Sequence, residues 1–184
     1  MKNNKFKGFT LIELAVVLLV IGILAGLVVR NYSGFTSSAR DTRRLADLRN
    51  ITNLLAAYYV GNNIFPDRTF AGAAASWTND FANLLVSNGI LANSNELPKD
   101  PQNNNNFYYR YYTCDRDVNP NGGTYGTGSA YILAARLETP TSNQAIYRES
   151  ATGNIQCLNQ SGLWTTRDGL GCYPSTTLFC LYVY

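Results

Sequence analysis

The chain has 184 residues, enough for one domain of ordinary size, and its 15 Lys and Arg against 12 Asp and Glu give a formal net charge of +3. It contains no histidine, which removes the commonest general base, the commonest metal ligand and the usual partner of a catalytic Ser or Cys. The segment from Gly126 to Ala130 also lacks the Gly-x-Ser-x-Gly spacing of a nucleophile elbow, so the composition argues against an enzyme.

The chain begins with a short basic segment that leads into a long apolar one. Residues 1–8 contain three lysines, and Phe9 to Val29 is 21 residues of almost unbroken Leu, Ile, Val, Ala and Gly. At about 1.5 Å per residue, a helix of this length is long enough to cross a hydrocarbon core of roughly 30 Å. Its only charge is Glu13, and a comparable Asp costs on the order of 2.5 to 3.5 kcal/mol at the centre of a membrane helix and less near an end. We therefore expect Glu13 to have a partner.

The junction between the two segments reads Gly8-Phe9-Thr10-Leu11-Ile12-Glu13. Together with the basic leader and the apolar run, it resembles the class III signal of type IV pilins and type II secretion pseudopilins. The resemblance implies that a prepilin peptidase cleaves after Gly8 and that the new amine of Phe9 is then methylated. It also implies that Glu13 pairs with the Phe9 amine of a neighbouring subunit. The likeness extends over residues 1–112 and is strongest at residues 6–30.

Two other interpretations of this region fit less well. An ordinary secretory signal has an apolar core of about 7 to 15 residues followed by a small-residue cleavage site, whereas this run is longer and Ala25-Gly26 is followed by more Leu and Val. A plain signal anchor would explain the length of the run, but it would not explain Glu13. Removal of the three leader lysines leaves 15 − 3 = 12 basic side chains against 12 acidic ones, so the charge gives no reason to expect nucleic-acid binding.

The region that follows has the spacing of an amphipathic helix. No proline occurs before Pro66, so we predict one continuous helix over residues 9–61. Residues 9–29 form its transmembrane and assembly part, and residues 30–61 form its amphipathic part. The apolar residues recur every three or four positions, and they are Leu45, Leu48, Ile51, Leu54, Leu55 and Tyr58.

Charged residues occupy other positions of the same segment. Asp41 is spaced to pair with Arg44 on the helix surface, and Asp47 is spaced to pair with Arg43 and Arg44. Exposed pairs of this kind contribute only about 0.2 to 0.5 kcal/mol each.

Residues 62–184 predict one globular head with an α+β fold. A short helix is expected at residues 78–88, with Thr78 or Asn79 as its cap. The 130–138 segment alternates so that one face is apolar and the other becomes polar toward its end. We therefore expect an antiparallel sheet with one face packed on the long helix, as in pilins. The predicted strands are residues 107–112, 130–138, 145–148, 155–158 and 178–184.

The four cysteines all lie in this head. Their even number and the absence of a Cys-x-x-Cys pair fit two disulfides in an oxidising compartment better than a zinc site. Three connectivities are open. We favour Cys172 with Cys180 and Cys114 with Cys157, because the first bond would tie down a tail that otherwise ends free.

A polar loop places oxygen ligands at alternate positions, as the start of a calcium loop does. Those residues are Asp115, Asp117, Asn119 and Asn121. The loop departs from the EF-hand pattern at its sixth place, Pro120, and at its twelfth, Gly126. The same residue types also form ordinary turns, so we favour a turn and expect no cofactor.

These features predict a structural subunit of a type IV pilus-like filament. The resemblance implies a single-pass inner-membrane precursor, assembly by a platform protein and a cytoplasmic ATPase, and an extracellular homo-oligomeric filament. A type II secretion pseudopilin is the alternative. It is favoured by the sheet pattern and by the segment Leu97-Pro98-Lys99-Asp100-Pro101, which resembles the turn before the sheet in pseudopilins, whereas the cysteine-bearing tail and the 13 tyrosines favour a surface pilus. A membrane-anchored binding module is an alternative of another class, and it predicts that Glu13 is dispensable.

Overall fold

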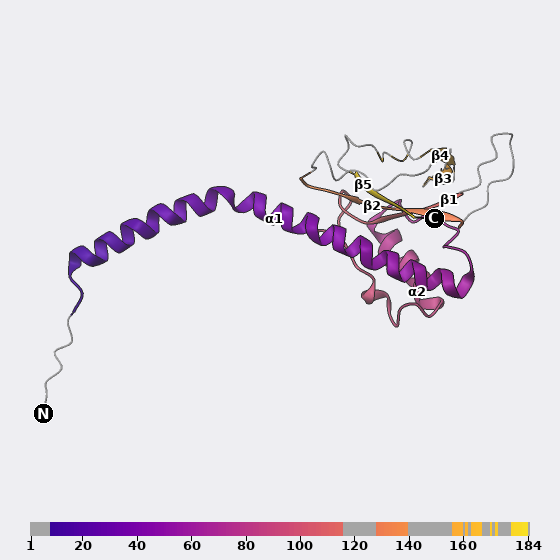
Figure 1. Ribbon diagram of the computed structural model, residues 1–184, viewed down its shortest axis with the longest axis horizontal. Helices are drawn as coiled ribbons and strands as arrows, with labels where there is room; N and C mark the ends of the chain where they lie inside the picture. The colour runs from indigo at the N-terminus through magenta and orange to yellow at the C-terminus, as the bar shows by residue number, and fades with distance from the viewer. Residues whose placement is uncertain are drawn as a thin grey trace, which may run out of the picture. The chain divides into compact units, whose positions relative to one another are not determined.

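The computed structural model describes residues 8–115, 128–139, 156–159, 161, 163–166, 170, 172 and 178–183 (Figure 1). For residues 27–33, 164–166 and 182 it describes the backbone but not the side chains. The chain divides into two units, Met1–Ser38 and Ala39–Tyr184, and the boundary between them lies inside the first helix.

Helix α1 runs from Leu11 to Asn62, where the sequence predicted a helix over residues 9–61. In the first unit, every described side chain from Gly8 to Gly26 is exposed. Within the part of the chain that the structure describes, no helix is both long and apolar enough to cross a membrane. The predicted membrane segment 9–29 includes three residues whose side chains lie outside the described set, and it stays a prediction.

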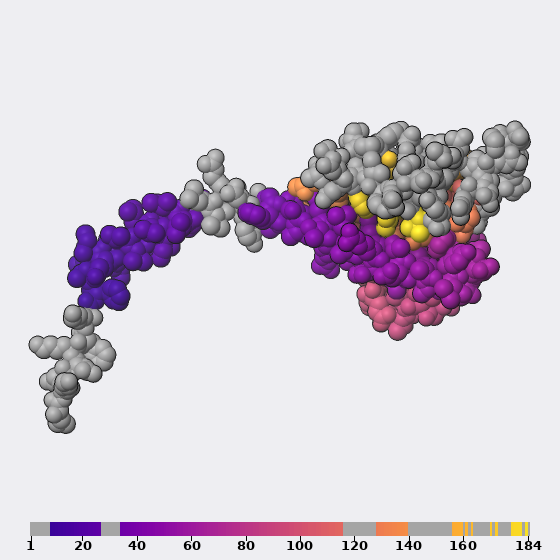
Figure 2. Space-filling view, viewed as in Figure 1, coloured from indigo at the N-terminus to yellow at the C-terminus, as the bar shows by residue number. Residues whose placement is uncertain are grey.

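In the second unit, α1 buries the predicted apolar stripe against one face of a sheet (Figure 1). Leu48, Ile51 and Leu55 are at most 1% exposed, because the residues that recur every three or four positions share this face of the helix. Around them lie aromatic side chains from the segment that follows α1, including Trp77 and Phe81. In Figure 2, α1 lies beside the segment around α2 (Ala82–Ser87) on the visible face of this unit.

The short helical segment of the head starts earlier than its predicted cap. A π-helix, η1 (Ser76–Phe81), continues directly into α2, and a 3₁₀ turn, η2 (Ser94–Glu96), follows. Ala75 already has helical dihedral angles, so the prediction that Thr78 or Asn79 caps the helix is wrong. The Thr78 hydroxyl instead donates a hydrogen bond back to the carbonyl of Ala74, at 3.1 Å.

The predicted antiparallel sheet is confirmed, and so is the α+β class. The described strands pair in the order β4-β3-β1-β2-β5, and each neighbouring pair is antiparallel. The sequence did not predict β4, and the predicted strand at residues 145–148 lies outside the described residues. The strands are β1 (Arg110–Asp115), β2 (Ala130–Arg136), β3 (Gln156–Leu158), β4 (Trp164–Thr166) and β5 (Leu178–Val183).

Strand β1 starts three residues later than predicted, because the backbone N–H and carbonyl of Phe107 are hydrogen-bonded to Asn104 within a turn. The side-chain oxygen of Asn104 accepts hydrogen bonds from the N–H groups of Asn106 and Phe107, at 2.9 and 3.0 Å. The carbonyl of Phe107 accepts the N–H of Asn104 in return, at 3.0 Å. Asn is a strong turn former because its side chain bonds nearby backbone groups in this way.

The two faces of the sheet are both largely apolar. Tyr111, Tyr131 and Leu133 belong to the core shared with α1. The other face holds a second buried cluster that contains all four cysteines. They form the disulfides Cys114–Cys157 and Cys172–Cys180, which is the connectivity that the sequence analysis favoured.

Most tyrosines whose side chains are described belong to the interior rather than to the surface. Tyr59 is 41% exposed. The buried ones are Tyr58, Tyr108, Tyr109, Tyr111, Tyr112 and Tyr131. These buried tyrosines therefore give no support to a surface pilus, since the core itself uses them.

We predict that Gly128→Ala destabilises the second unit by at least about 2 kcal/mol, because an L residue is strained there and the new methyl group collides with backbone. Gly128 has φ of +81°, and an added Cβ would lie 2.5 Å from the carbonyl oxygen of Phe65. The control is Gly89→Ala, where φ is +70° but nothing lies within 4 Å, and it should cost only about 1 kcal/mol. Urea unfolding followed by tryptophan fluorescence measures both, and equal losses would contradict the predicted collision.

Candidate functional site

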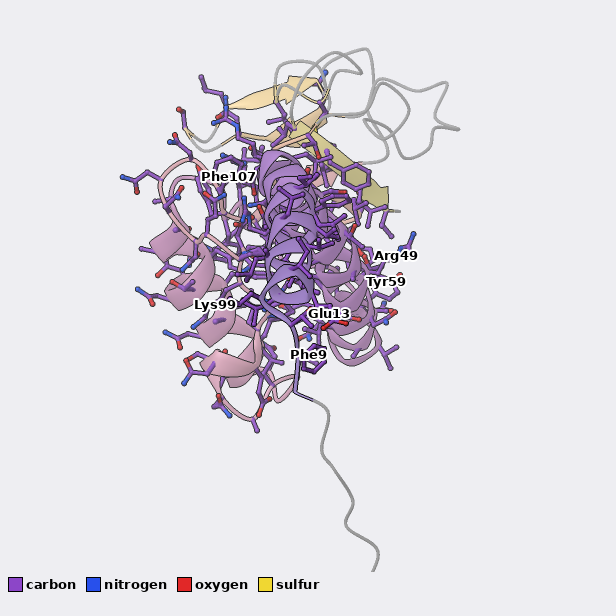
Figure 3. All side chains as sticks on the ribbon, turned by 90° about the vertical axis from the view of Figure 1, so that its left-hand side faces the viewer. Phe9, Glu13, Arg49, Tyr59, Lys99 and Phe107 are labelled. Carbon is purple, nitrogen blue, oxygen red and sulfur yellow. A yellow bond between two sulfur atoms is a disulfide. The ribbon has the colours of Figure 1, made fainter. Side chains whose placement is uncertain are left out.

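Thr10 and Glu13 form a reciprocal cap at the beginning of α1, and Figure 3 labels Glu13 near Phe9 at this end of the helix. The Thr10 N–H and hydroxyl both donate to Oε2 of Glu13, each at 2.8 Å. The Glu13 N–H donates to the Thr10 hydroxyl oxygen at 3.3 Å. This is a capping box, in which the side chains at the N-cap and three residues later satisfy each other's backbone N–H groups. The carboxylate thus has a partner in its own chain.

Sequence reasoning missed this role of Thr10, although the signal was local. A Thr followed three residues later by Glu, just before an apolar run, is a known mark of a helix start. The position also suits a carboxylate electrically, since the N-terminus of a helix carries a partial positive charge. The charge in the apolar run is therefore placed where a single helix best tolerates it.

The cap uses only one of the two carboxylate oxygens. Within the described residues, Oε1 of Glu13 accepts no hydrogen bond, whereas Oε2 accepts two. Phe9 is 89% exposed, and Gly8 has open space around it. Gly8 and Phe9, which flank the peptide bond expected to be cut, and Glu13 are thus all exposed in the described part of the chain. The rest of the expected leader, residues 1–7, lies outside the described residues.

A second charged group lies buried inside the head and centres on Arg44. This side chain is 0% exposed, and its Nε and Nη2 donate to the two oxygens of Asp100 at 2.7 and 3.0 Å. Its Nη1 donates to Asp41 and to Glu138, each at 2.7 Å. Arg40 also binds Glu138, at 2.7 Å from its Nε. The cluster joins α1 to the turn at Leu97 to Pro101 and to the residues after β2.

Two expectations from the sequence about the ion pairs of Arg44 are wrong. Asp41 and Arg44 were expected to form an exposed pair of small value, but both are buried. Arg44 does not bind Asp47, whose carboxylate instead accepts the Tyr109 hydroxyl at 2.7 Å. The expected pair of Arg43 with Asp47 is present at 3.8 Å, and Arg43 is exposed.

Hydrogen bonds lower the pKa of two carboxyl groups of the cluster, those of Glu138 and Asp41. The hydrogen bond from Arg40, with help from Arg44, lowers the pKa of Glu138 to about 2. Burial raises the pKa of Asp41, but hydrogen bonds from Thr139, from the Glu138 N–H and from Arg44 outweigh it, so the pKa is lowered overall. Burial lowers the pKa of Arg44, and the hydrogen bonds to its carboxylates more than reverse this. The hydrogen bonds therefore favour the charged forms of Glu138, Asp41 and Arg44.

We predict that acid weakens the head through this cluster. A carboxyl group with a lower pKa in the folded than in the unfolded chain adds stability above its unfolded pKa, about 4.3 for Glu, and loses it as the pH falls through the folded value. The free energy of unfolding should thus fall from about pH 5 toward the folded pKa of Glu138, about 2. Urea unfolding at each pH measures this decline, which should be shallower in Glu138→Gln. The same slope in both proteins would contradict the assignment.

The candidate calcium loop is only partly described. Asp115 is buried at the end of β1, and Asp117, Asn119 and Asn121 lie outside the described residues. Among the described residues, no group of three or more His, Cys, Asp or Glu side chains is arranged to hold a metal ion. The turn, which the sequence favours over a metal loop, therefore stays a prediction.

Known proteins are similar to this chain both at the N-terminal junction and over most of its length. Residues 3–29 match the family model described as the prokaryotic N-terminal methylation motif. The type II secretion system core protein G of Vibrio cholerae is 32% identical over 136 residues, which are 73% of this chain and 84% of that protein. No solved structure matches the chain significantly.

Pilus proteins match the chain at similar identity. The type IV major pilin protein PilE of Neisseria gonorrhoeae is 32% identical over 107 residues, 54% of this chain and 64% of PilE. Fimbrial protein Q of Moraxella bovis is 29% identical over 163 residues, 88% of this chain and 85% of that protein. The likeness thus extends well beyond the N-terminal motif.

Proposed function

We propose, since the chain belongs to the family of type IV pilins and type II secretion pseudopilins, that it is a structural subunit of a pilus-like filament. Proteins of this family are structural and not enzymes. The methylation motif and the apolar run imply a precursor in the inner membrane and a mature protein at the cell surface. Residues 9–29 would hold the precursor in the membrane, with the basic leader on the cytoplasmic side.

Assembly begins with cleavage after Gly8 by a prepilin peptidase. The cut turns the Phe9 nitrogen from an amide into a positively charged amine, four residues from the carboxylate of Glu13. This amine is then methylated. A platform protein and a cytoplasmic ATPase move each processed subunit from the membrane into the growing filament.

The observation that carries this proposal is that Oε1 of Glu13 accepts no hydrogen bond from the described residues. The capping box fixes the carboxylate through Oε2, so Oε1 is left to accept a donor from another chain. The Phe9 amine of a neighbouring subunit supplies both the donor and the opposite charge, which removes the cost of an unpaired carboxylate in apolar surroundings. The contact also sets the axial position of one subunit on the next.

The apolar helix supplies the lateral contacts. Large apolar side chains of the first unit are about half or more exposed in the single chain, among them Leu11 at 90% and Leu19 at 66%. Packing against identical helices would bury them, and the small residues Gly22 and Gly26 allow helices to approach closely. This arrangement needs many copies of the same chain, as a filament provides.

The choice between a pilus subunit and a secretion pseudopilin rests on separate observations. The Leu97 to Pro101 turn, which holds Asp100 in the buried cluster, favours the pseudopilin branch. The disulfide-bonded C-terminal region favours a surface pilus subunit. We place the pilus first.

Deletion of the gene tests this choice. Electron microscopy would count surface filaments, and assay of the culture medium would measure secreted proteins. A pilus subunit is expected to be needed for filaments and not for secretion. Loss of secretion with normal surface filaments would contradict the pilus assignment and favour the pseudopilin. Restoring the gene on a plasmid is the control.

A further inference from the structure

Two arginines, Arg110 and Arg136, lie on the sheet face opposite α1 without an acidic partner among the residues that the structure describes. Arg110 stands directly across from Ala134 in the antiparallel pairing of β1 with β2. Residues paired in this way point to the same side of a sheet, and so does every second residue along a strand. Arg136 therefore shares this face with Arg110, and it lies two residues beyond Ala134 along β2.

The Arg110 side chain is held in place by an aromatic ring. Its guanidinium carbon lies 4.0 Å from the centre of the Tyr108 ring. Tyr108 is 7% exposed, and its hydroxyl donates to the carbonyl of Ala71 at 3.0 Å. Stacking on a ring uses the flat face of a guanidinium and leaves its N–H edge free for another partner.

The N–H edge of Arg110 includes a donor that has no acceptor among the described residues. Among the buried side-chain nitrogens and oxygens of the described residues, Nη1 of Arg110 is the one atom without a hydrogen-bond partner. None of the ion pairs between described residues includes Arg110 or Arg136, whereas Arg40 and Arg44 both bind carboxylates. A buried donor without an acceptor is costly, more so when it carries charge. An acceptor placed at this edge would remove that cost.

A third donor lies on the same face. Tyr112 is two residues beyond Arg110 on β1, and it is 5% exposed. Burial raises the pKa of its phenol, so the hydroxyl stays protonated at neutral pH. The face thus gathers two guanidinium groups and a phenolic hydroxyl, with no carboxylate among the described residues to neutralise them.

We propose that Arg110 and Arg136 form a binding site for an oxyanion, a carboxylate or a phosphate group. A guanidinium edge presents parallel N–H donors that match two oxygens of either group, and it binds them more strongly than a neutral donor does. Arg110 supplies the fixed edge, and the exposed Arg136 supplies the second charge. The site is separate from the N-terminal junction around Glu13, and binding of an oxyanion there does not depend on filament assembly.

The test is titration of the full chain in detergent with inorganic phosphate and, separately, with acetate. Isothermal titration calorimetry measures the affinity, and sodium chloride at matched ionic strength is the control for general screening. Saturable binding is expected for at least one oxyanion and not for chloride. Binding of phosphate alone would assign a phosphate site, binding of acetate alone a carboxylate site, and binding of both a general oxyanion site. No saturable binding of either ion would overturn the proposal.

Variants locate the binding within the chain. Arg110→Gln should weaken it by at least roughly tenfold, and Arg136→Gln should weaken it less, because only Arg110 offers a fixed and buried edge. Arg110→Lys keeps the charge but loses the paired N–H edge, so it should also bind weakly. Arg49→Gln, at an exposed arginine on α1 (Figure 3), is the matched control and should bind as the parent does. Unchanged affinity in a folded Arg110→Gln or Arg110→Lys protein would overturn the proposal.

Discussion

Glu13→Ala is expected to be produced, inserted and folded but to form no filaments. The substitution removes the carboxylate that we propose to pair with the Phe9 amine of a neighbour, so each junction would leave one positive charge unmatched among apolar helices. It also removes half of the capping box, which costs the helix start about 1 kcal/mol. That loss lies in the first unit and leaves the head intact. Electron microscopy of sheared cell-surface material measures the outcome.

Thr10→Ala separates the two roles of Glu13. This variant loses the hydroxyl donor to Oε2 and the acceptor of the Glu13 N–H, but it keeps the backbone N–H donor and the carboxylate itself, so filaments should be fewer rather than absent. Thermal melting of each variant would verify that the head is folded. Normal filaments in Glu13→Ala would contradict the assembly model and favour the membrane-anchored binding module, for which Glu13 is dispensable.

Arg44→Ala is expected to destabilise the head by about 3 to 5 kcal/mol. Arg44 is 0% exposed, and it makes four hydrogen bonds to three carboxylates. Its removal would leave Asp41 and Asp100 buried without their cation, and it would also leave a cavity where the guanidinium lay against the Phe107 ring. Urea unfolding of the full chain in detergent, followed by tryptophan fluorescence, gives the free energy.

Arg43→Ala is the matched control for this experiment. The neighbouring arginine is exposed, and its pair with Asp47 is long at 3.8 Å, so the loss should be below about 0.5 kcal/mol. Arg44→Lys should fall between the two, since an ammonium group keeps the charge but cannot bind Asp100 through two parallel N–H groups. Equal effects of Arg43→Ala and Arg44→Ala would show that the cluster contributes nothing special.

Local patterns predicted much of the helix. The stripe of Leu48, Ile51 and Leu55 follows from residues that lie within one or two turns of each other, and a sequence displays that spacing directly. The partners of Arg44 are of another kind, because Asp100 is 56 residues away and Glu138 is 94. No spacing rule joins such positions, so an arginine on a helix looked like a surface residue until the tertiary contacts were known.

The strands show the same division. The sequence predicted a strand near residues 107–112, but the Asn104 turn shifted its beginning to Arg110, because a side chain competed for the backbone. The second buried face of the sheet was also unexpected, since it depends on the Cys114–Cys157 and Cys172–Cys180 bonds as much as on alternation within one strand.

The proposed assembly site rests on local sequence alone. Gly8, Phe9 and Glu13 stand together in a short motif, so their proposed roles needed no tertiary information. The capping role of Thr10 was equally local and was nevertheless missed. Its hydrogen bonds changed the question about Glu13, from whether the carboxylate has any partner to which of its oxygens is left for a second chain.

Mass spectrometry of filaments sheared from the cell surface tests the central claim most directly. We expect this chain to be present in them and its N-terminal peptide to begin at Phe9 with one added methyl group. An N-terminus at Met1 with the leader intact, or the absence of this chain from the filaments, would contradict it.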